Sequence, residues 1–206
     1  METFTVLVVL LFSIILHEYA HGFVAYKNGD DTAYLMGRLT FNPVKHIDIF
    51  GTIILPLICY LSHIPMFGWA KPVPVNFLRL NNPKRDMAKV AFAGPASNLL
   101  LVVLCVILFK VLIILNYPEV NAFKILSYGI QINLLLAIFN LIPVPPLDGS
   151  KILAAFLPTQ QSLKYLRLER FGMIFVVLLI ISGGFRLIIL PILDFALNLI
   201  NLIIGA

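Results

Sequence analysis

The chain has 206 residues, of which 60% are hydrophobic and only 12% are charged, and its formal net charge is +5. A soluble globular domain is about 45–50% apolar and about 25% charged, so this composition excludes an ordinary water-soluble fold. The apolar residues come in long runs, which favours a protein that folds in a lipid bilayer. Basic residues cluster between these runs, a pattern typical of membrane topology, and we expect no nucleic-acid partner.

The first apolar run, from Thr3 to about Tyr26, is long enough to cross a membrane as one helix. At 1.5 Å per residue it would span about 36 Å, against a hydrocarbon core of about 30 Å. The run lacks a basic N-terminal region and a small-residue cleavage site, so we interpret it as a retained span and not as a signal peptide. Gly29, Asp30 and Asp31 would end it, because acids have no place in lipid.

The region after this run is mixed in polarity. Residues 37–43 predict a short strand followed by a turn, and residues 73–77 also have strand character. Residues 47–61 are apolar but are interrupted by a glycine and a proline, so they form either a re-entrant segment or a full crossing. We expect His46 and His63 to be polar residues at the membrane surface.

Three further apolar runs predict the rest of the molecule: residues 88–115, 123–142 and 171–204. The last run has 34 residues, so it is either a kinked span with an interfacial tail or two short crossings. We expect a single integral-membrane domain over residues 1–206, with a core of about 3–157 and a C-terminal apolar helical region. Its predicted fold is an all-α polytopic transmembrane helix bundle with a short re-entrant or strand-containing segment.

The first span contains the sequence His17-Glu18-Tyr19-Ala20-His21. Histidines four residues apart lie on one face of a helix, which is the spacing that two nitrogen ligands of one Zn²⁺ require. Glu18 is placed to take a proton from water at the metal, as in metalloproteases with this pattern. Three ionisable residues within a membrane helix are costly unless something satisfies them. A metal would satisfy all three, and hydrogen bonds between helices are the alternative.

A catalytic zinc site needs a third protein ligand, and Asp148 is the best placed acid. It follows the proline-rich break at residues 143–146, directly after a predicted span. The other acids lie in loops or at span ends or, for Asp194, in the C-terminal tail. Asp148 could instead cap the helix that begins at Gly149, and the residues alone leave both roles open.

The position of Asp148 and the charges together indicate a topology. If residues 47–61 cross fully, Asp148 emerges on the membrane face opposite the histidine end of the first span; if they dip in and return, it lies on the same side. The second arrangement places nearly all lysines and arginines on one side, leaving chiefly Lys124 on the other. The positive-inside rule makes that side cytoplasmic. We therefore predict a multi-pass protein of the cell membrane, with its N-terminus outside and its site towards the cytoplasm.

Three motifs together carry a resemblance to a known family. HEYAH lies in an apolar helix, Gly94-Pro-Ala-Ser-Asn98 opens another, and Asn140-Leu-Ile-Pro-Val-Pro-Pro-Leu-Asp148-Gly149 follows a third. This combination resembles the site-2 protease family, the intramembrane zinc metalloproteases of peptidase family M50. The resemblance covers about residues 10–155, and the stretches at 41–43 and 68–76 look like the shorter bacterial or archaeal members.

The resemblance implies one Zn²⁺ per chain, held by His17, His21 and Asp148, with Glu18 as the general base. It implies that the substrates are transmembrane proteins in the bilayer, hydrolysed within or near their spans in regulated intramembrane proteolysis. Asn140 would lie near the scissile peptide. Asn140 and Asn98 are our candidates for binding the substrate backbone or the developing oxyanion. Hydrogen bonding between helices is the other reading of both asparagines.

A substrate helix must unwind before its peptide bonds can be attacked, and pairing with an enzyme edge strand would hold it extended. Residues 35–42 or 73–77 could supply that edge. Two competing functions are a metal-binding membrane scaffold that does not cut and a divalent-metal transporter. The intact Glu18 argues against the scaffold. A transporter would need ionisable groups distributed along a path, whereas here they gather at one depth.

Overall fold

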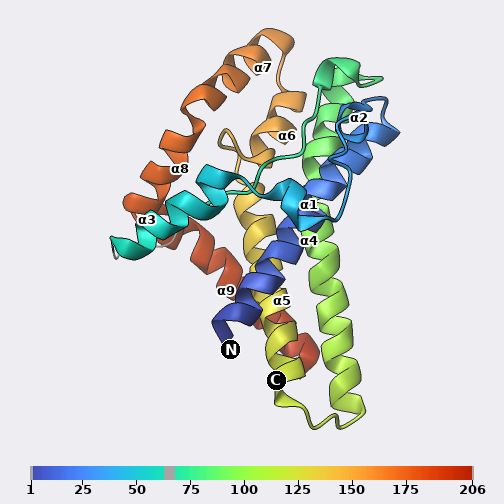
Figure 1. Cartoon of the computed structure of the whole chain (residues 1–206), viewed down its shortest axis with the longest axis vertical. Coiled ribbons are helices and arrows are strands. Elements are labelled where there is room, and N and C mark those ends of the chain that lie inside the picture. Colours follow the sequence, from blue (N-terminus) through green and yellow to red (C-terminus); the bar gives the residue numbers. More distant parts are fainter. Residues whose placement is uncertain (1, 63–67, 206) are drawn as a thin grey trace.

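The computed structural model describes residues 2–62 and 68–205, and these form helices joined by loops and short turns (Figure 1). Within this part of the chain, four helices are long and apolar enough to cross a membrane. They are α1 (Glu2–Lys27), α4 (Pro83–Ile114), α5 (Val120–Asn140) and Arg186–Ile204, which contains most of η5 (Phe185–Ile189) and all of α9 (Leu190–Ile204). The prediction of an all-α membrane protein is confirmed.

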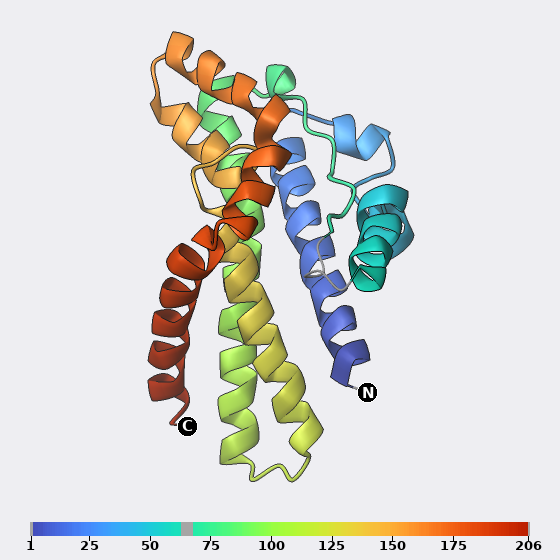
Figure 2. The same ribbon diagram turned by 90° about the vertical axis from the view of Figure 1, so that its left-hand side faces the viewer.

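The long helix α4 forms the centre of the bundle, because it packs against α1, α5 and α6 (Asp148–Phe156). A short link joins α4 to α5 at one end of the molecule, while α2 (Thr32–Leu35), α6 and α7 (Thr159–Leu166) lie at the other (Figures 1 and 2). The end of α1, the start of α4 and the end of α5 therefore meet at the same end of the bundle. This arrangement places Asp148 beside the histidines of α1.

The outer surface of the bundle is apolar. Leu100 and Ile114 of α4 are 70% and 75% exposed, and Leu202 of α9 is 80% exposed, which suits contact with lipid chains. An apolar core joins α4, α5 and α9 through Val102, Ile130, Leu134 and Ile204. Towards the other end of α4, the buried side chains include polar ones, and this is where the functional site lies.

The predicted strands are wrong. No strand is present in the described residues, and the backbone from 68 to 76 runs as an irregular extended segment. Pro72 and Pro74 lack the N–H donors that a strand ladder needs, and neighbouring amides are bonded to side chains instead. Around residues 37–42 the chain forms turns, with Gly37 at φ +61°, a conformation that favours glycine.

Between α2 and α4, the described residues form short helices: η1 (Pro43–His46), η2 (Ile49–Ile54), α3 (Leu55–Leu61) and η3 (Phe77–Arg79). Together η2 and α3 extend about 20 Å at 1.5 Å per residue, too short for a crossing of about 30 Å. His46 is fully buried instead of lying at the surface, and its Nε2 donates to the Thr40 carbonyl. His63 lies outside the described residues.

The C-terminal apolar region passes along the bundle once. After η4 (Arg167–Phe171), α8 (Gly172–Ile181) runs to the middle of the molecule and α9 continues to the far end (Figure 2). Gly183, at φ +75°, lies in the break between them. Of the two arrangements expected for residues 171–204, the structure has the kinked passage.

Candidate metal centre

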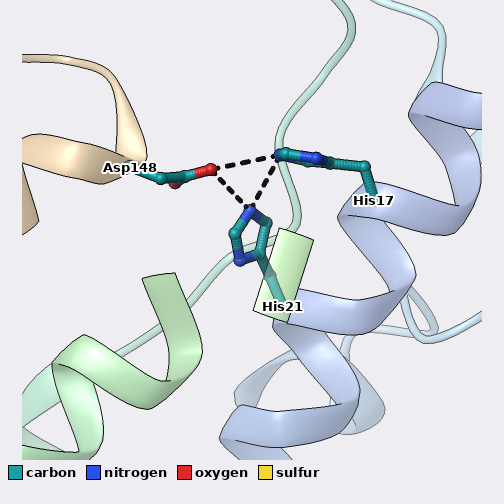
Figure 3. A group of neighbouring side chains, drawn as sticks. All are labelled: His17, His21 and Asp148. Atoms are coloured by element: carbon teal, nitrogen blue, oxygen red, sulfur yellow. Dashed lines mark hydrogen bonds and ion pairs between the residues drawn. The ribbon is translucent and has the colours of Figure 1, made fainter. Parts of the chain in front are cut away.

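Three side chains from two separate helices meet at one point. His17 and His21 project from the same face of α1, and Asp148 reaches them from the first turn of α6 (Figure 3). The Nε2 atoms of the histidines are 3.0 Å apart, and Asp148 Oδ2 lies 3.1 Å from each. All three residues are buried. Among the described residues they form a group able to hold a metal ion.

The outer ring nitrogens of both histidines are already engaged. His21 Nδ1 lies 2.7 Å from the Val90 carbonyl, which can only accept, so this nitrogen carries the proton. His17 Nδ1 lies 2.6 Å from Asn98 Oδ1. Both neutral rings then direct an Nε2 lone pair at the Asp148 carboxylate. Three acceptors this close repel one another unless a cation lies between them.

A zinc ion fits this donor set. Ligand atoms 2.0–2.1 Å from a tetrahedral zinc lie about 3.3 Å from one another, close to the 3.0–3.1 Å edges of the triangle. Two imidazoles and one carboxylate are the ligand types of catalytic zinc sites that keep a fourth position open. Burial raises the pKa of the Asp148 carboxyl, whereas positive charge on the histidines, or on a metal ion between them, holds it below its usual range. The carboxyl is therefore ionised, as a metal ligand must be.

Two glycines let the surrounding backbone approach the triangle. A Cβ on Gly94 of α4 would overlap His21 Nε2 and come within 2.6 Å of His17 Nε2, so α4 can pass here only without a side chain. A Cβ on Gly149 would lie 2.5 Å from the Ile142 carbonyl, so the turn from α5 into α6 also needs glycine. These contacts give a steric reason for the glycine that opens the motif ending at Asn98 and for the glycine that follows Asp148.

Asp148 does not act as the cap of α6, because Leu147 occupies the N-cap position. Being in the first turn, its negative charge is favoured by the helix dipole. Lys151, one turn later, has its Nζ 3.8 Å from the other carboxylate oxygen, Oδ1. The carboxylate thus has one oxygen towards the histidines and one towards a cation.

Glu18 lines a cavity of about 600 Å³ beside the triangle. Its Oε2 accepts a hydrogen bond of 2.7 Å from the backbone amide of Val73. Oε1 makes no hydrogen bond with the described part of the chain. The carboxylate is therefore held by one oxygen and presents the other for proton transfer.

The opposite wall of the cavity is the extended segment 68–76, which is held from behind. Buried Arg38 donates from Nη2 to the carbonyls of Lys71 and Pro72, at 2.9 and 3.1 Å. The fully buried Asp30 accepts from the Asn76 amide at 2.6 Å. Further hydrogen bonds fix the remaining backbone: Trp69 amide to Gly51 carbonyl, Lys71 amide to His46 carbonyl, and Thr52 hydroxyl to Trp69 carbonyl.

The two candidate asparagines lie in different places. Asn140, the last residue of α5, lines the cavity and donates to the Leu136 carbonyl. Asn98 is fully buried behind His17 and does not itself line the cavity. Sequence reasoning missed the Val73 amide, Lys151 and Asn133. Only Asn133 carried a usable signal, because it is a second asparagine inside a membrane span, two turns before Asn140.

The chain is similar in sequence to known proteins. Residues 5–117 and 114–183 match Peptidase family M50. "Putative zinc metalloprotease YwhC" of Bacillus subtilis is 38% identical over 192 residues, covering 91% of this chain and 84% of that protein. "Putative zinc metalloprotease Rip2" of Mycolicibacterium smegmatis is 30% identical over 185 residues, which is 84% of this chain and 64% of that protein.

"Zinc metalloprotease MJ0392" of Methanocaldococcus jannaschii is 27% identical over 155 residues, covering 74% of this chain and 34% of that protein. No solved structure matches the chain. The family match includes both α1, with its two histidines, and the turn that carries Asp148. The chain therefore belongs to peptidase family M50.

Proposed function

We propose that this protein is an intramembrane zinc metalloprotease in which His17, His21 and Asp148 hold one zinc ion and Glu18 is the general base. The observation that carries the proposal is the buried triangle of two Nε2 atoms and one carboxylate oxygen, with edges of 3.0–3.1 Å, beside a cavity lined by Glu18. Membership of a peptidase family and the zinc metalloprotease names of the relatives support the same activity.

The residues divide the chemistry between them. When bound, zinc supplies Lewis-acid polarisation of the peptide carbonyl and lowers the pKa of the attacking water. Glu18 takes the proton from that water through Oε1 and later returns it to the leaving amine, while the Val73 amide holds Oε2. Asn140 borders the cavity, where its amide can bind the substrate backbone near the scissile bond.

The substrate is a transmembrane segment of another protein, unwound locally so that its peptide bonds become accessible. The extended segment 68–76 offers backbone groups along one wall of the cavity, and Val75 N–H makes no hydrogen bond with the described residues. An unwound substrate bonds to such groups without the described residues having to form a sheet. Basic residues flank the site end of the bundle, which supports a cytoplasmic site and an outside N-terminus.

The test is cleavage of a single-span reporter by purified, detergent-solubilised protein, with bound zinc measured on the same samples. Glu18→Gln should keep about one zinc per chain and lose at least about 100-fold in cleavage rate, because a general base contributes 10²–10⁴-fold. Glu119→Gln, an exposed acid at the other end of α5, is the matched control and should cleave like wild type.

Wild-type protein without zinc would overturn the metal assignment. Cleavage by Glu18→Gln at the wild-type rate would overturn the role of Glu18. Zinc bound by both proteins and no cleavage of any transmembrane reporter would favour a metal-binding scaffold instead.

A further inference from the structure

A continuous chain of polar side chains runs behind the metal centre, through three membrane-spanning helices. Ser13 on α1, Asn98 on α4 and Asn133 on α5 are 0–2% exposed, so lipid and water do not reach them. Buried polar groups in a membrane span are costly unless they are fully hydrogen-bonded. Within the described part of the chain, they reach the cavity lining through His17, which Asn98 contacts.

The direction of this chain is set by backbone carbonyls. Asn133 Nδ2 donates to the Gly129 carbonyl at 2.8 Å and to Ser13 Oγ at 2.9 Å, so the amide nitrogen must be on that side. Ser13 Oγ in turn donates to the Val9 carbonyl at 2.8 Å, which leaves its lone pairs to accept. Asn133 therefore has to present its oxygen, Oδ1, to Asn98.

The same logic fixes the next amide. Asn98 Nδ2 lies 2.8 Å from Asn133 Oδ1 and 3.4 Å from the Ser13 carbonyl, both of which accept. Asn98 must then turn its own oxygen to His17 Nδ1, 2.6 Å away. A flipped Asn98 would place its oxygen against two acceptors and its NH₂ group against the ring. The proton of neutral His17 is thereby kept on Nδ1, and the lone pair stays on Nε2.

From this geometry we infer that Asn98 and Asn133 are positioning residues for the metal ligand His17, with Asn133 acting through Asn98. We call this chain from Asn133 through Asn98 to His17 the relay. The inference rests on the proposed metal site. His21 needs no such chain, because the Val90 carbonyl holds its Nδ1 directly. Outer partners of this kind typically change metal affinity by 10–100-fold when they are removed.

The experiment measures zinc affinity of the full-length protein by competition with a chromophoric chelator, and the visible spectrum of the Co²⁺-substituted protein. Asn133→Leu removes both the donor and the acceptor, and should weaken zinc binding by about 10–100-fold and change the Co²⁺ spectrum. Ser127→Ala is the matched control on α5, because Ser127 bonds only to the Phe123 carbonyl of its own helix. It should leave affinity within about twofold of wild type.

A second pair of variants, at Asn98, tests the positioning of His17 even if Asn133→Leu fails to fold. Asn98→Asp keeps an oxygen for His17 Nδ1, whereas Asn98→Leu removes it. The relay predicts zinc affinity within a few-fold of wild type for Asp and a loss of at least about tenfold for Leu. A residue that merely joins helices would instead lose as much with Asp, since it needs its NH₂ group.

Equal affinities for Asn133→Leu and wild type, or equal losses for the two Asn98 variants, would overturn the relay. In both cases wild type would still bind zinc, so the proposed function would stand. Wild type without zinc affinity would instead remove the proposed function itself.

Discussion

The two walls of the cavity are built by different means. The wall that carries the metal ligands consists of helices α1, α4 and α6, and its histidines are held by the Asn98 side chain and the Val90 carbonyl. The facing wall, segment 68–76, has no regular structure, and side chains from elsewhere hold its backbone: Arg38, Asp30 and Glu18. The helical wall fixes three atoms in space, whereas the extended wall fixes a path along which a peptide can lie.

Because of this difference, we expect substitutions in the helical wall to weaken zinc binding and substitutions in the extended wall to leave zinc binding unchanged. Gly94→Ala should have the largest effect, because its Cβ would overlap the two Nε2 atoms. We expect zinc affinity to fall by more than about 100-fold, the upper end of outer-partner effects, because the ligands themselves are displaced. Gly129→Ala is the control for a clash elsewhere between α4 and α5, since its Cβ would lie 2.8 Å from the Cys105 sulfur and touch neither imidazole, while its carbonyl stays in place for Asn133. Retention of zinc by Gly94→Ala would show that the packing of α4 against the imidazoles does not fix the metal ligands.

Val73→Pro tests the hydrogen bond between Glu18 of α1 and the extended wall. It removes the N–H that holds Glu18 Oε2 and replaces the buried Val73 side chain with a ring. A hydrogen bond to a charged group contributes about 1.5–3 kcal/mol, so cleavage should slow by about 10–100-fold with zinc still at about one per chain. Val73→Ala is the control, because it also removes the Val73 side chain but keeps the N–H that Glu18 accepts. If Val73→Ala cleaves as slowly as Val73→Pro, the effect belongs to the lost side chain and not to the hydrogen bond of Glu18.

Arg38→Met should have the smallest effect of the three. It leaves the carbonyls of Lys71 and Pro72 without their donor and loosens the extended wall. We expect cleavage to fall about tenfold, equivalent to about 1.4 kcal/mol, with zinc content unchanged. Arg79→Met removes an arginine that is half exposed and paired with Asp31, where such pairs contribute about 0–1 kcal/mol. Loss of zinc in Arg38→Met would show that the walls are not independent.

The same division explains what the sequence could predict. The helical wall follows from local rules: His17 and His21 share a face because of the helix period, and a metal site in a span needs a further ligand such as Asp148. The extended wall does not follow from local rules. Its alternating apolar residues predicted a strand. Two of its residues are prolines without an N–H group, however, and the amides of Val73 and Asn76 donate to the side chains of Glu18 and Asp30 instead of to a neighbouring strand.

The relay lies between these cases. Asn98 stood out because it lies in a motif, yet its partner Asn133 could be paired with it only once α4 and α5 were placed side by side. Likewise Gly94 could be seen in the sequence, but its reason, the passage of α4 against two imidazoles, depends on tertiary packing. Spacing within one helix is readable from sequence, whereas contacts between helices are not.

The three metal-ligating residues are synthesised at different times. His17 and Asp148 are 131 residues apart in the chain. At synthesis rates of about 5–20 residues per second, roughly 7–26 s pass between the two residues. During that interval α1 is already made but lacks its third ligand, and α4 and α5 have to be inserted before α6 can close the triangle. A growing polypeptide therefore has two of the three ligand side chains, and its metal centre stays incomplete until Asp148 has been made.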